Sequence, residues 1–218
     1  MLLPQLVSMN PAQIIVCDNG STDSTRDVVH SAGAQWVYEA QRGYGAACFA
    51  GMRSLADSID VVVFMDADLS DDLNDLGALV DPVDGGEYDL VIGARAEALQ
   101  EPRSTRFPQR FANRLFPLLI RWGWGFHFTD LGPFRAVRRS ALEAIDMKDR
   151  AFGWTIEMQI RAVELGLRIC EVPVRCHKRR CGESKISGTI LGVARAAYWI
   201  TRTCGAMWLT KRHRMRSS

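Results

Sequence analysis

The chain has 218 residues, of which 47% are apolar and 24% are charged, so it can bury a substantial core and is too apolar to be disordered. Its net charge of +2 is small, but the charges are unevenly distributed. Nine acidic residues and no Lys or Arg lie from Asp66 to Asp89, whereas no acidic residue follows Glu183. The basic C-terminal end therefore predicts an anionic partner: phosphate, nucleic acid or a membrane surface.

Other classes of protein are excluded by the sequence pattern. No segment approaches 18 uninterrupted apolar residues, so no membrane span is predicted, and Met1–Pro4 lacks the basic flank and cleavage site of a signal peptide. The six cysteines form no C-x-x-C pair, which indicates a reduced protein in the cytosol. Cys176, His177 and Cys181 are conceivable metal ligands, but no fourth ligand stands at a suitable spacing.

The first half of the chain alternates short apolar segments, typical of strands, with segments of about ten residues that are typical of helices. This alternation predicts βαβ units, a mostly parallel sheet and right-handed crossovers. Ligands of such sheets bind beyond the carboxyl ends of the strands, where Asp18 and Asp66 lie. The predicted strands are 13–17, 35–38, 61–65 and 89–93, and the predicted helices end near Ala32, run from 46 to 56 and run from 74 to 83.

The run from Asp60 to Asp72 is the most informative stretch, because apolar strand residues give way abruptly to carboxylates. Side chains alternate along an extended segment, so Asp66 and Asp68 point to the same side. Two such carboxylates repel each other unless a cation or a hydrogen-bond network holds them. Mg²⁺ or Mn²⁺ would do so and would bring diphosphate oxygens as further ligands. The alternative is an Asp-rich turn that caps the helix starting near Asn74.

The second half of the chain departs from this alternation. Residues 103–121 are helix-like. Trp122–Phe128 is a run of aromatic residues separated by glycine, which fits either the core or an interface with lipid. The remaining predicted elements are a tight turn at Thr129–Arg135, a helix over 155–164 and an edge strand over 167–175.

Two basic segments occupy the end of the chain. His177–Lys185 gathers four basic side chains around a glycine and a serine, which suits neutralisation of a diphosphate, although a solvated basic loop is the alternative. Without interleaved aromatics, nucleic-acid binding is not expected. Residues 186–209 have the pattern of an amphipathic helix with Trp and Tyr, and the basic run Lys211–Arg216 follows. This pattern fits attachment to an anionic membrane face or packing of the helix across the domain.

Five motifs occur in order along the chain: Val16–Asp23, Arg42–Gly45, Met65–Ser70, Thr129–Arg135 and Arg180-x-Gly182-x-Ser184-Lys185. Together they resemble the family 2 glycosyltransferases of the GT-A fold, especially the polyprenyl- (dolichyl-) phosphate sugar synthases. The resemblance covers nearly the whole chain, from about residue 11 to about residue 190. It implies an α/β GT-A domain over residues 1–185, with a mostly parallel, Rossmann-like sheet flanked by helices. Residues 186–218 would form a C-terminal amphipathic helix and a basic tail.

The resemblance also implies an activity. A sugar would pass from a UDP- or GDP-sugar to a polyprenyl-phosphate type of acceptor, with inversion at the anomeric carbon and with Mg²⁺ or Mn²⁺ as cofactor. The enzyme would act at the inner face of the cell membrane, held there from the cytoplasm by the aromatic patch and the C-terminal helix.

The same resemblance assigns roles to individual positions. The metal ligands would be Asp66 and Asp68, of which Asp66 also belongs to the donor site. The nucleotide side would be bound by Asp18, Gly20, Ser21, Asp23, Arg42 and Gly43. The diphosphate would be covered by Arg180, Ser184 and Lys185. The candidate catalytic residues are Asp130 and Arg135, on the sugar and acceptor-phosphate side, and Glu157, near the donor sugar.

One feature departs from the family pattern. Members of the family begin with a strand that carries a Pro-x-x-Asn-Glu-like turn and lies centrally in the sheet, whereas this chain starts at Met1–Pro4, where the helix after that strand should end. We therefore expect the strands 14–17 and 61–65 to lose a shared neighbour and its hydrogen bonds. Either the start given is late, or the chain is a fragment with weakened donor binding.

Two other functions remain as alternatives. A sugar nucleotidyltransferase also uses a Rossmann-like sheet and paired aspartates, but it would show a Gly-rich loop with Arg and Lys after its first strand, and none is present. The other alternative is a truncated, non-catalytic GT-A scaffold that binds membrane without turnover.

Overall fold

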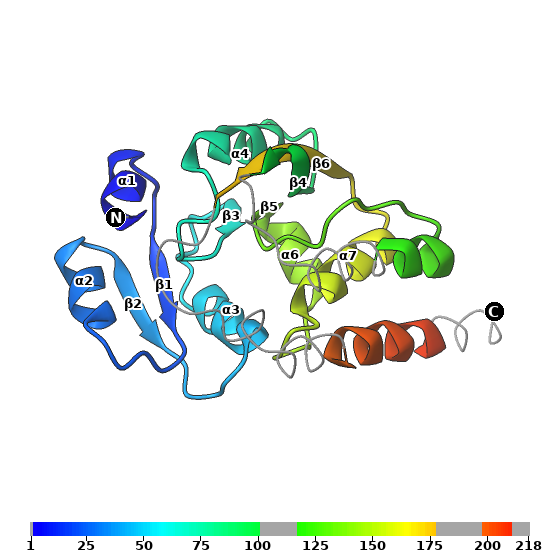
Figure 1. The fold of residues 1–218 in the computed structure, drawn as a ribbon, viewed down its shortest axis with the longest axis horizontal. Coiled ribbons are helices and arrows are strands. Elements are labelled where there is room, and N and C mark those ends of the chain that lie inside the picture. Colours follow the sequence, from blue (N-terminus) through cyan, green and yellow to red (C-terminus); the bar gives the residue numbers. More distant parts are fainter. Residues whose placement is uncertain (1, 101–116, 178–197, 211–218) are drawn as a thin grey trace.

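The computed structural model describes residues 2–100, 117–177 and 198–210, and within this part the chain forms an α/β fold with two sheets (Figure 1). One sheet pairs β1 with β2, and the other has the strand order β3-β5-β4-β6. Helices flank the sheets, as the sequence predicts. The predicted domain boundary between residues 185 and 186 lies outside the described residues.

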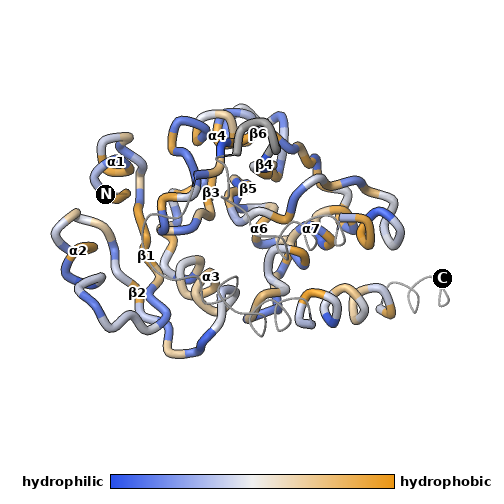
Figure 2. Tube along the Cα trace, viewed as in Figure 1, coloured by the Kyte–Doolittle hydropathy of each residue, from blue (hydrophilic) through white to orange (hydrophobic). Residues whose placement is uncertain are grey.

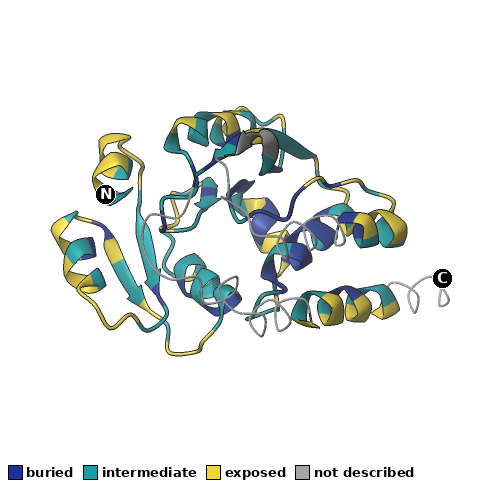
Figure 3. Cartoon of the chain, viewed as in Figure 1, coloured by how far each residue is buried: buried dark blue, intermediate teal, exposed yellow. Residues whose placement is uncertain are grey.

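The first sheet is small and parallel. β1 (Ile15–Asp18) pairs in register with β2 (Gln35–Tyr38), and α2 (Thr25–Ser31) forms the crossover between them. α3 (Tyr44–Met52) packs against both strands. Burial is sparse here, as Figure 3 shows, and α1 (Leu2–Ser8) has no buried residue. This unit therefore holds together through few apolar contacts.

The second sheet contains the core. β3 (Val61–Phe64) and β4 (Leu90–Gln100) each pair antiparallel with β5 (Arg135–Arg138), and β4 pairs in parallel with β6 (Ile169–Cys176). The sheet is thus mixed, because β5 runs antiparallel to both of its neighbours, and β6 is an edge strand, as predicted. A 3₁₀ turn, η1 (Leu73–Asp75), leads into α4.

Apolar residues cover both faces of this sheet, because neighbouring strand residues point to opposite sides. α4 (Leu76–Asp84) covers one face, where Leu79 and Val83 pack with Val91 of β4. α6 (Arg139–Ile145) and α7 (Trp154–Glu164) cover the other face, where Leu90 and Ile92 are buried. The sheet is therefore a buried layer between helices, and Figure 3 shows burial concentrated in α6 and α7.

The two sheets part between β1 and β3. No described strand pairs with the free edge of either. This geometry agrees with the expectation that these strands lose a shared neighbour.

Backbone hydrogen bonds connect α3, which packs on the first sheet, to the loop 149–151, which precedes α7. The N–H groups of Gly45 and Ala46, in the first turn of α3, donate to the carbonyl oxygens of Ala151 (3.1 Å) and Arg150 (2.9 Å). A Cβ atom at Gly43 or Gly45 would overlap the backbone of the loop 149–151. The glycines of the Arg42–Gly45 motif therefore permit close approach of two chain segments.

The aromatic run divides between the two interpretations that the sequence allows. Residues 117–124 form a helix, and Trp122 on it is 80% exposed, whereas Phe128 is fully buried. A second helix covers residues 198–210, and its Trp208 stacks on Trp122 with ring centroids 6.2 Å apart. Apolar stretches recur along both helices in Figure 2. Part of the run thus belongs to the core and part to an exposed aromatic surface.

The helix over 198–210 is also packed against the domain. Its Cys204 is buried in the main core, and the Thr203 hydroxyl donates to Asp149 Oδ2 (2.9 Å). Within the described residues, no helix is both long and apolar enough to cross a membrane. The five cysteines in this part of the chain are free thiols.

Candidate active site

Asp18 ends β1 and is held in place by its neighbours. Its Oδ1 accepts a hydrogen bond from the Ser21 N–H (2.7 Å), and its Oδ2 accepts one from the Trp36 indole (3.3 Å). Burial would raise the pKa of Asp18, but the hydrogen bonds from Ser21, Trp36 and Gly20 outweigh it and lower the pKa. Asp18 is therefore an ionised acceptor at the end of a strand.

The turn after β1 is tied to the start of α3. The Asn19 side chain accepts from the Gly43 N–H (2.8 Å) and donates to the Gln41 carbonyl (2.7 Å). Gly20 has a φ of 89°, and the Arg42 guanidinium lies 3.0 Å from where a Cβ atom on Gly20 would stand. The structure thus brings Gly20, Arg42 and Gly43 together around Asp18 and Ser21, and their role in nucleotide binding stays a prediction.

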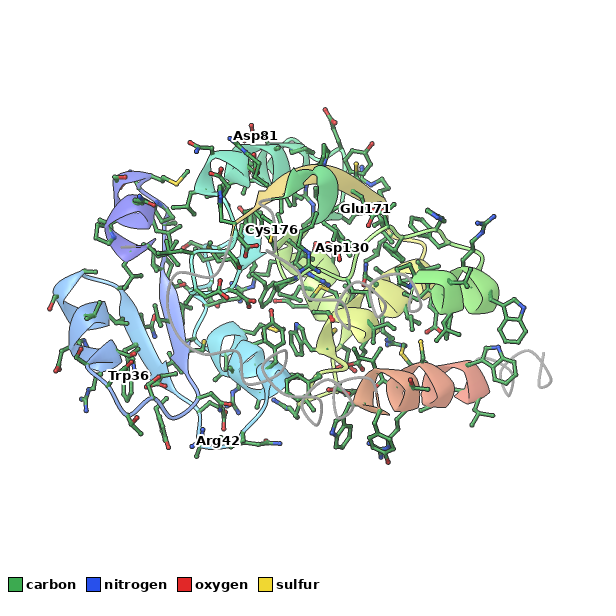
Figure 4. All side chains as sticks on the ribbon, viewed as in Figure 1. Trp36, Arg42, Asp81, Asp130, Glu171 and Cys176 are labelled. Atoms are coloured by element: carbon green, nitrogen blue, oxygen red, sulfur yellow. The ribbon has the colours of Figure 1, made fainter. Side chains whose placement is uncertain are left out.

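Asp23 has a local role in the structure. Its carboxylate accepts hydrogen bonds from the backbone and the hydroxyl of Thr25 at the start of α2, and these bonds lower its pKa. A ligand-binding role for Asp23 remains a prediction. In Figure 4, Trp36 and Arg42 mark this side of the molecule, apart from Asp130 and Cys176.

A loop rich in carboxylates, residues 66–75, follows β3, and we call it the carboxylate loop. Asp66 is partly exposed, whereas Asp68 is only 9% exposed and its Oδ1 accepts from the Ser70 N–H (2.9 Å). Leu69, between Asp68 and Ser70, has a φ of 65°, a left-handed backbone conformation that is strained for a residue with a side chain. The loop therefore adopts a specific, strained shape at the position where the sequence predicts a metal.

Asp71 is a third carboxylate in this loop. It is buried, and its Oδ2 accepts from the Asp66 N–H (3.2 Å). Burial, together with the negative charge of Asp66, raises the pKa of Asp71 to about 7. The concentration of negative charge here is the electrostatic condition under which a cation stabilises a site.

The capping alternative applies to one residue of the loop only. Asp72, not Asp66 or Asp68, caps the following turn, because its Oδ1 accepts from the Asn74 N–H (2.9 Å). Among the described residues, no group of three His, Cys, Asp or Glu side chains is arranged to hold a metal ion. Mg²⁺ commonly takes one or two carboxylates and completes its shell with water and substrate phosphates, so Asp66 and Asp68 fit such an ion.

The end of β6 lies against the carboxylate loop. The His177 N–H donates to the Ser70 carbonyl (2.9 Å), and Cys176 forms an isolated bridge with Asp71. The predicted diphosphate-binding residues Arg180, Ser184 and Lys185 lie outside the described residues, as does Cys181. Their segment follows His177 in the sequence.

Asp130 is paired with Arg95, a residue outside the five sequence motifs. The Arg95 guanidinium donates to both oxygens of Asp130 (2.6 and 2.7 Å), and the Arg95 N–H donates as well (3.0 Å). Burial would raise the pKa of Asp130, but the charge and hydrogen bonds of Arg95 lower it. Asp130 is therefore an ionised, internally paired carboxylate, only 3% exposed.

Arg135 lies in the core, 1% exposed, and burial lowers its pKa. Its guanidinium donates to the carbonyl oxygens of Gly132 and Thr155. Its Nε atom has no hydrogen-bond partner. Arg135 is therefore positioned to support the surrounding backbone at Gly132 and Thr155, and its predicted catalytic role stays a prediction.

Glu157 is also bound internally. Its carboxylate accepts from the backbone N–H groups of Lys148 (3.1 Å) and Asp149 (2.7 Å), and burial raises its pKa. It thereby shapes the loop that contacts α3.

Comparison with known proteins agrees with this architecture. Residues 2–146 match the family model described as glycosyl transferase family 2. An uncharacterized glycosyltransferase of Mycobacterium tuberculosis strain H37Rv is 36% identical over 203 residues, which span 90% of each chain. This chain belongs to glycosyltransferase family 2. The sugar nucleotidyltransferase alternative is thereby overturned.

Two further relatives of this glycosyltransferase have more specific names. The undecaprenyl-phosphate mannosyltransferase of Micrococcus luteus is 34% identical over 198 residues, covering 84% of this chain and 79% of the relative. The polyprenol monophosphomannose synthase of Mycolicibacterium smegmatis is 34% identical over 191 residues, covering 81% of this chain and 71% of the relative.

Solved structures confirm the GT-A fold. Glucosyl-3-phosphoglycerate synthase from Mycobacterium tuberculosis, in complex with Mn²⁺, UDP and glucosyl-3-phosphoglycerate, matches with a TM-score of 0.67 at 23% identity. The match covers 89% of this chain and 69% of that chain. Another mycobacterial protein matches with a TM-score of 0.71 at 20% identity, over 94% of this chain and 69% of that chain.

Several residues around the site of this glycosyltransferase were missed in the sequence. Arg95 comes soon after the apolar run Leu90–Ile92 in the sequence, much as Asp66 follows its apolar run, and that shared signal was available although β4 continues through Arg95. Glu171 accepts from the N–H groups of Thr129 and Asp130, and it depends on contacts about 40 residues away in the chain. No local pattern predicts such a contact.

Proposed function

We propose that this glycosyltransferase moves a sugar from a nucleoside diphosphate sugar to a polyprenyl-phosphate type of acceptor at a membrane surface, with inversion and with Mg²⁺ or Mn²⁺. The observation that carries the proposal is the carboxylate loop, in which Asp66 and Asp68 follow β3 while Ser70 and Asp71 contact the end of β6. The names of the Micrococcus and Mycolicibacterium relatives support the acceptor class. The Mn²⁺ and UDP complex of the structural neighbour supports the donor class.

The chemistry demands little of a general base. A phosphate oxygen of the acceptor is already ionised at neutral pH and attacks the anomeric carbon, while the nucleoside diphosphate leaves. A divalent ion held by Asp66 and Asp68 would stabilise the charge on that leaving group. The residues of the chain then act by binding and orienting: Asp18 and Ser21 on the nucleotide side, with Asp130 and Arg135 supporting the walls of the site.

The metal ligands can be tested directly. We expect Asp68→Asn to lower metal-dependent transfer by on the order of 100-fold, because the leaving-group charge loses its stabilisation. The measurement is a transfer assay with UDP- and GDP-sugars and a polyprenyl phosphate. Calorimetry of Mn²⁺ with UDP or GDP supplies a binding measurement without turnover.

Asp81→Asn is the matched control, because Asp81 is an exposed aspartate on α4, away from the loop (Figure 4). Unchanged transfer by Asp68→Asn would refute the metal assignment. A wild-type chain that binds vesicles but no nucleotide would instead support the non-catalytic scaffold.

The membrane part of the proposal rests on an exposed apolar surface made by the helices 117–124 and 198–210. Leu118 and Trp122 on the first helix and Leu209 on the second are each more than half exposed. Trp122 stacks on Trp208, which joins the two helices at this end. Basic residues follow in the sequence from Lys211 to Arg216, and such residues are attracted to anionic lipid. We place the enzyme on the cytoplasmic, inner face, in keeping with its free thiols.

The double variant Leu118→Ser with Trp122→Ser tests this surface. We expect it to lower binding to phosphatidylglycerol vesicles, measured by co-sedimentation, while folding is retained, because both side chains are exposed. Val7→Ser with Met9→Ser is the control, since these exposed apolar residues lie in and just after α1. Equal losses in the two double variants would contradict a specific membrane surface.

A further inference from the structure

A cluster of ion pairs fastens the carboxylate loop to β6. The Arg175 guanidinium reaches two carboxylates of the loop: Nη2 lies 2.5 Å from Asp75 Oδ1, and Nε lies 3.2 Å from Asp72 Oδ2. The backbone N–H of Arg175 also donates to Asp75 Oδ2 (2.7 Å). A single residue of the edge strand therefore holds two positions of the loop.

His177, two residues after Arg175, adds contacts nearer to the proposed metal ligands Asp66 and Asp68. His177 Nε2 lies 3.2 Å from Asp72 Oδ2, and the His177 N–H donates to the Ser70 carbonyl. Asp72 and Asp75 are largely buried within this cluster, with side-chain exposures of 12% and 13%. The cluster thus restrains the loop immediately after Asp68 and again at its end.

A restraint from outside the carboxylate loop matters, because the loop brings carboxyl groups close together and contains a strained residue. Asp66, Asp68 and Asp71 place three carboxyl groups in close succession, and Leu69 has a left-handed backbone conformation. Strained positions persist only when the surrounding structure fixes them. In metal sites, the partners that orient the ligands change metal affinity by about 10- to 100-fold when they are removed.

We propose that Arg175 is a positioning residue, which holds the carboxylate loop through Asp72 and Asp75 so that Asp66 and Asp68 are preformed for a divalent ion and a nucleoside diphosphate. The proposal rests on the proposed function, since it concerns the same metal site. Arg175 forms its ion pairs with Asp72 and Asp75 rather than with the proposed metal ligands Asp66 and Asp68, so it acts through the loop. Its loss therefore lowers the affinity of the site rather than the rate once the site is filled.

The chain contains a matched control at the other end of the second sheet. Arg168, just before β6, makes the same kind of pair with Asp89: its N–H donates at 3.0 Å, and its Nη2 lies 2.7 Å from Asp89 Oδ1. That pair lies at the opposite end of β6 from the carboxylate loop. Arg168→Leu thus removes an equivalent ion pair without touching the loop.

The experiment compares Arg175→Leu, Arg175→Lys and Arg168→Leu with the wild type. We expect Arg175→Leu to weaken the binding of Mn²⁺ with UDP or GDP about tenfold or more, measured by calorimetry, and to raise the metal concentration needed for half-maximal transfer. Saturating metal should restore most of kcat. Arg175→Lys should recover part of the affinity, and Arg168→Leu should bind as the wild type does.

Hydrogen exchange of the ligand-free protein gives a result that does not depend on turnover. Amides of residues 66–75 should exchange faster in Arg175→Leu than in Arg168→Leu. Unchanged exchange there, or equal loss of affinity in the two leucine variants, would overturn the proposal. If the wild type binds no Mn²⁺ with either nucleotide, the proposed function fails, while the exchange comparison still decides whether Arg175 holds the loop.

Discussion

Asp18 shows how neighbouring residues can fix a side chain on the proposed nucleotide side of the site. Two donors from different segments, the Ser21 N–H and the Trp36 indole, hold its two oxygens. Trp36 is itself oriented by Tyr38, which stacks on it at 6.0 Å, and by Arg26, whose guanidinium lies 4.8 Å from the ring centroid. A carboxylate fixed in this way offers a fixed acceptor geometry to an N–H group of a nucleobase.

We predict that Trp36→Phe weakens nucleotide binding roughly fivefold, because it removes one hydrogen bond to Asp18 while keeping an aromatic ring at the position. Isothermal titration with UDP and GDP in the presence of Mn²⁺ measures the change. Tyr38→Phe serves as the control, since it leaves both hydrogen bonds to Asp18 intact. Wild-type affinity in Trp36→Phe would show that the indole does not orient Asp18 for binding.

The residues that sequence analysis could name are those whose signal is local. Asp66 and Asp68 stand where an apolar strand ends, so their position at a sheet end follows from the pattern alone. The pairing of Asp130 with Arg95 spans 35 residues, and nothing near either residue indicates it. Burial shifts the pKa values of Arg135 and Glu157 and limits their access to a ligand, and burial is a property of the packed fold. Their predicted catalytic roles stay predictions.

At the scale of elements, the alternation of strands and helices was predictable, but the direction of β5 was not. β5 pairs antiparallel with both β3 and β4 and so separates two strands that a simple βαβ pattern would place side by side. The choice of neighbour is made by residues far apart in sequence, such as Val62 with Val137. The local pattern specifies that a strand forms, whereas long-range packing selects its partners.

The contact between α3 and the loop 149–151 is the element-scale feature most open to a stability test. We predict that Gly45→Ala lowers the free energy of unfolding by about 1–3 kcal/mol, because a Cβ there overlaps the backbone of Asp149 and Arg150. Urea denaturation measures the change. Gly205→Ala is the control: Gly205 lies in the helix 198–210 with open space around it, so alanine should stabilise by up to about 1 kcal/mol. A neutral Gly45→Ala would mean that this junction is loosely packed.

At the scale of the whole molecule, the division between β1 and β3 separates two parts of unequal stability. The strands of the second sheet are covered by helices on both faces, and Leu90, Val91 and Ile92 of β4 are fully buried. β1 and β2 form a sheet of two strands, in which Asp18 is the only buried residue. A two-stranded sheet is marginal by itself and depends on what packs against it. The proposed nucleotide side of the site thus belongs to the less stable part.

This difference predicts the pattern of amide hydrogen exchange in the ligand-free protein. Amides of β1 and β2 should exchange through local opening at a lower free energy than those of β4 and β5, which should approach the global value. Mass spectrometry of peptides covering 15–18, 35–38 and 90–95 measures the contrast. A ligand that binds at Asp18 stabilises the closed form by mass action, so UDP or GDP with Mn²⁺ should slow exchange in β1 and leave β4 unchanged. Equal protection of β1 and β4 without ligand would show that the divided sheet behaves as one cooperative unit. In that case, α3 and the loop 149–151 couple the two parts more strongly than the strand pairing indicates.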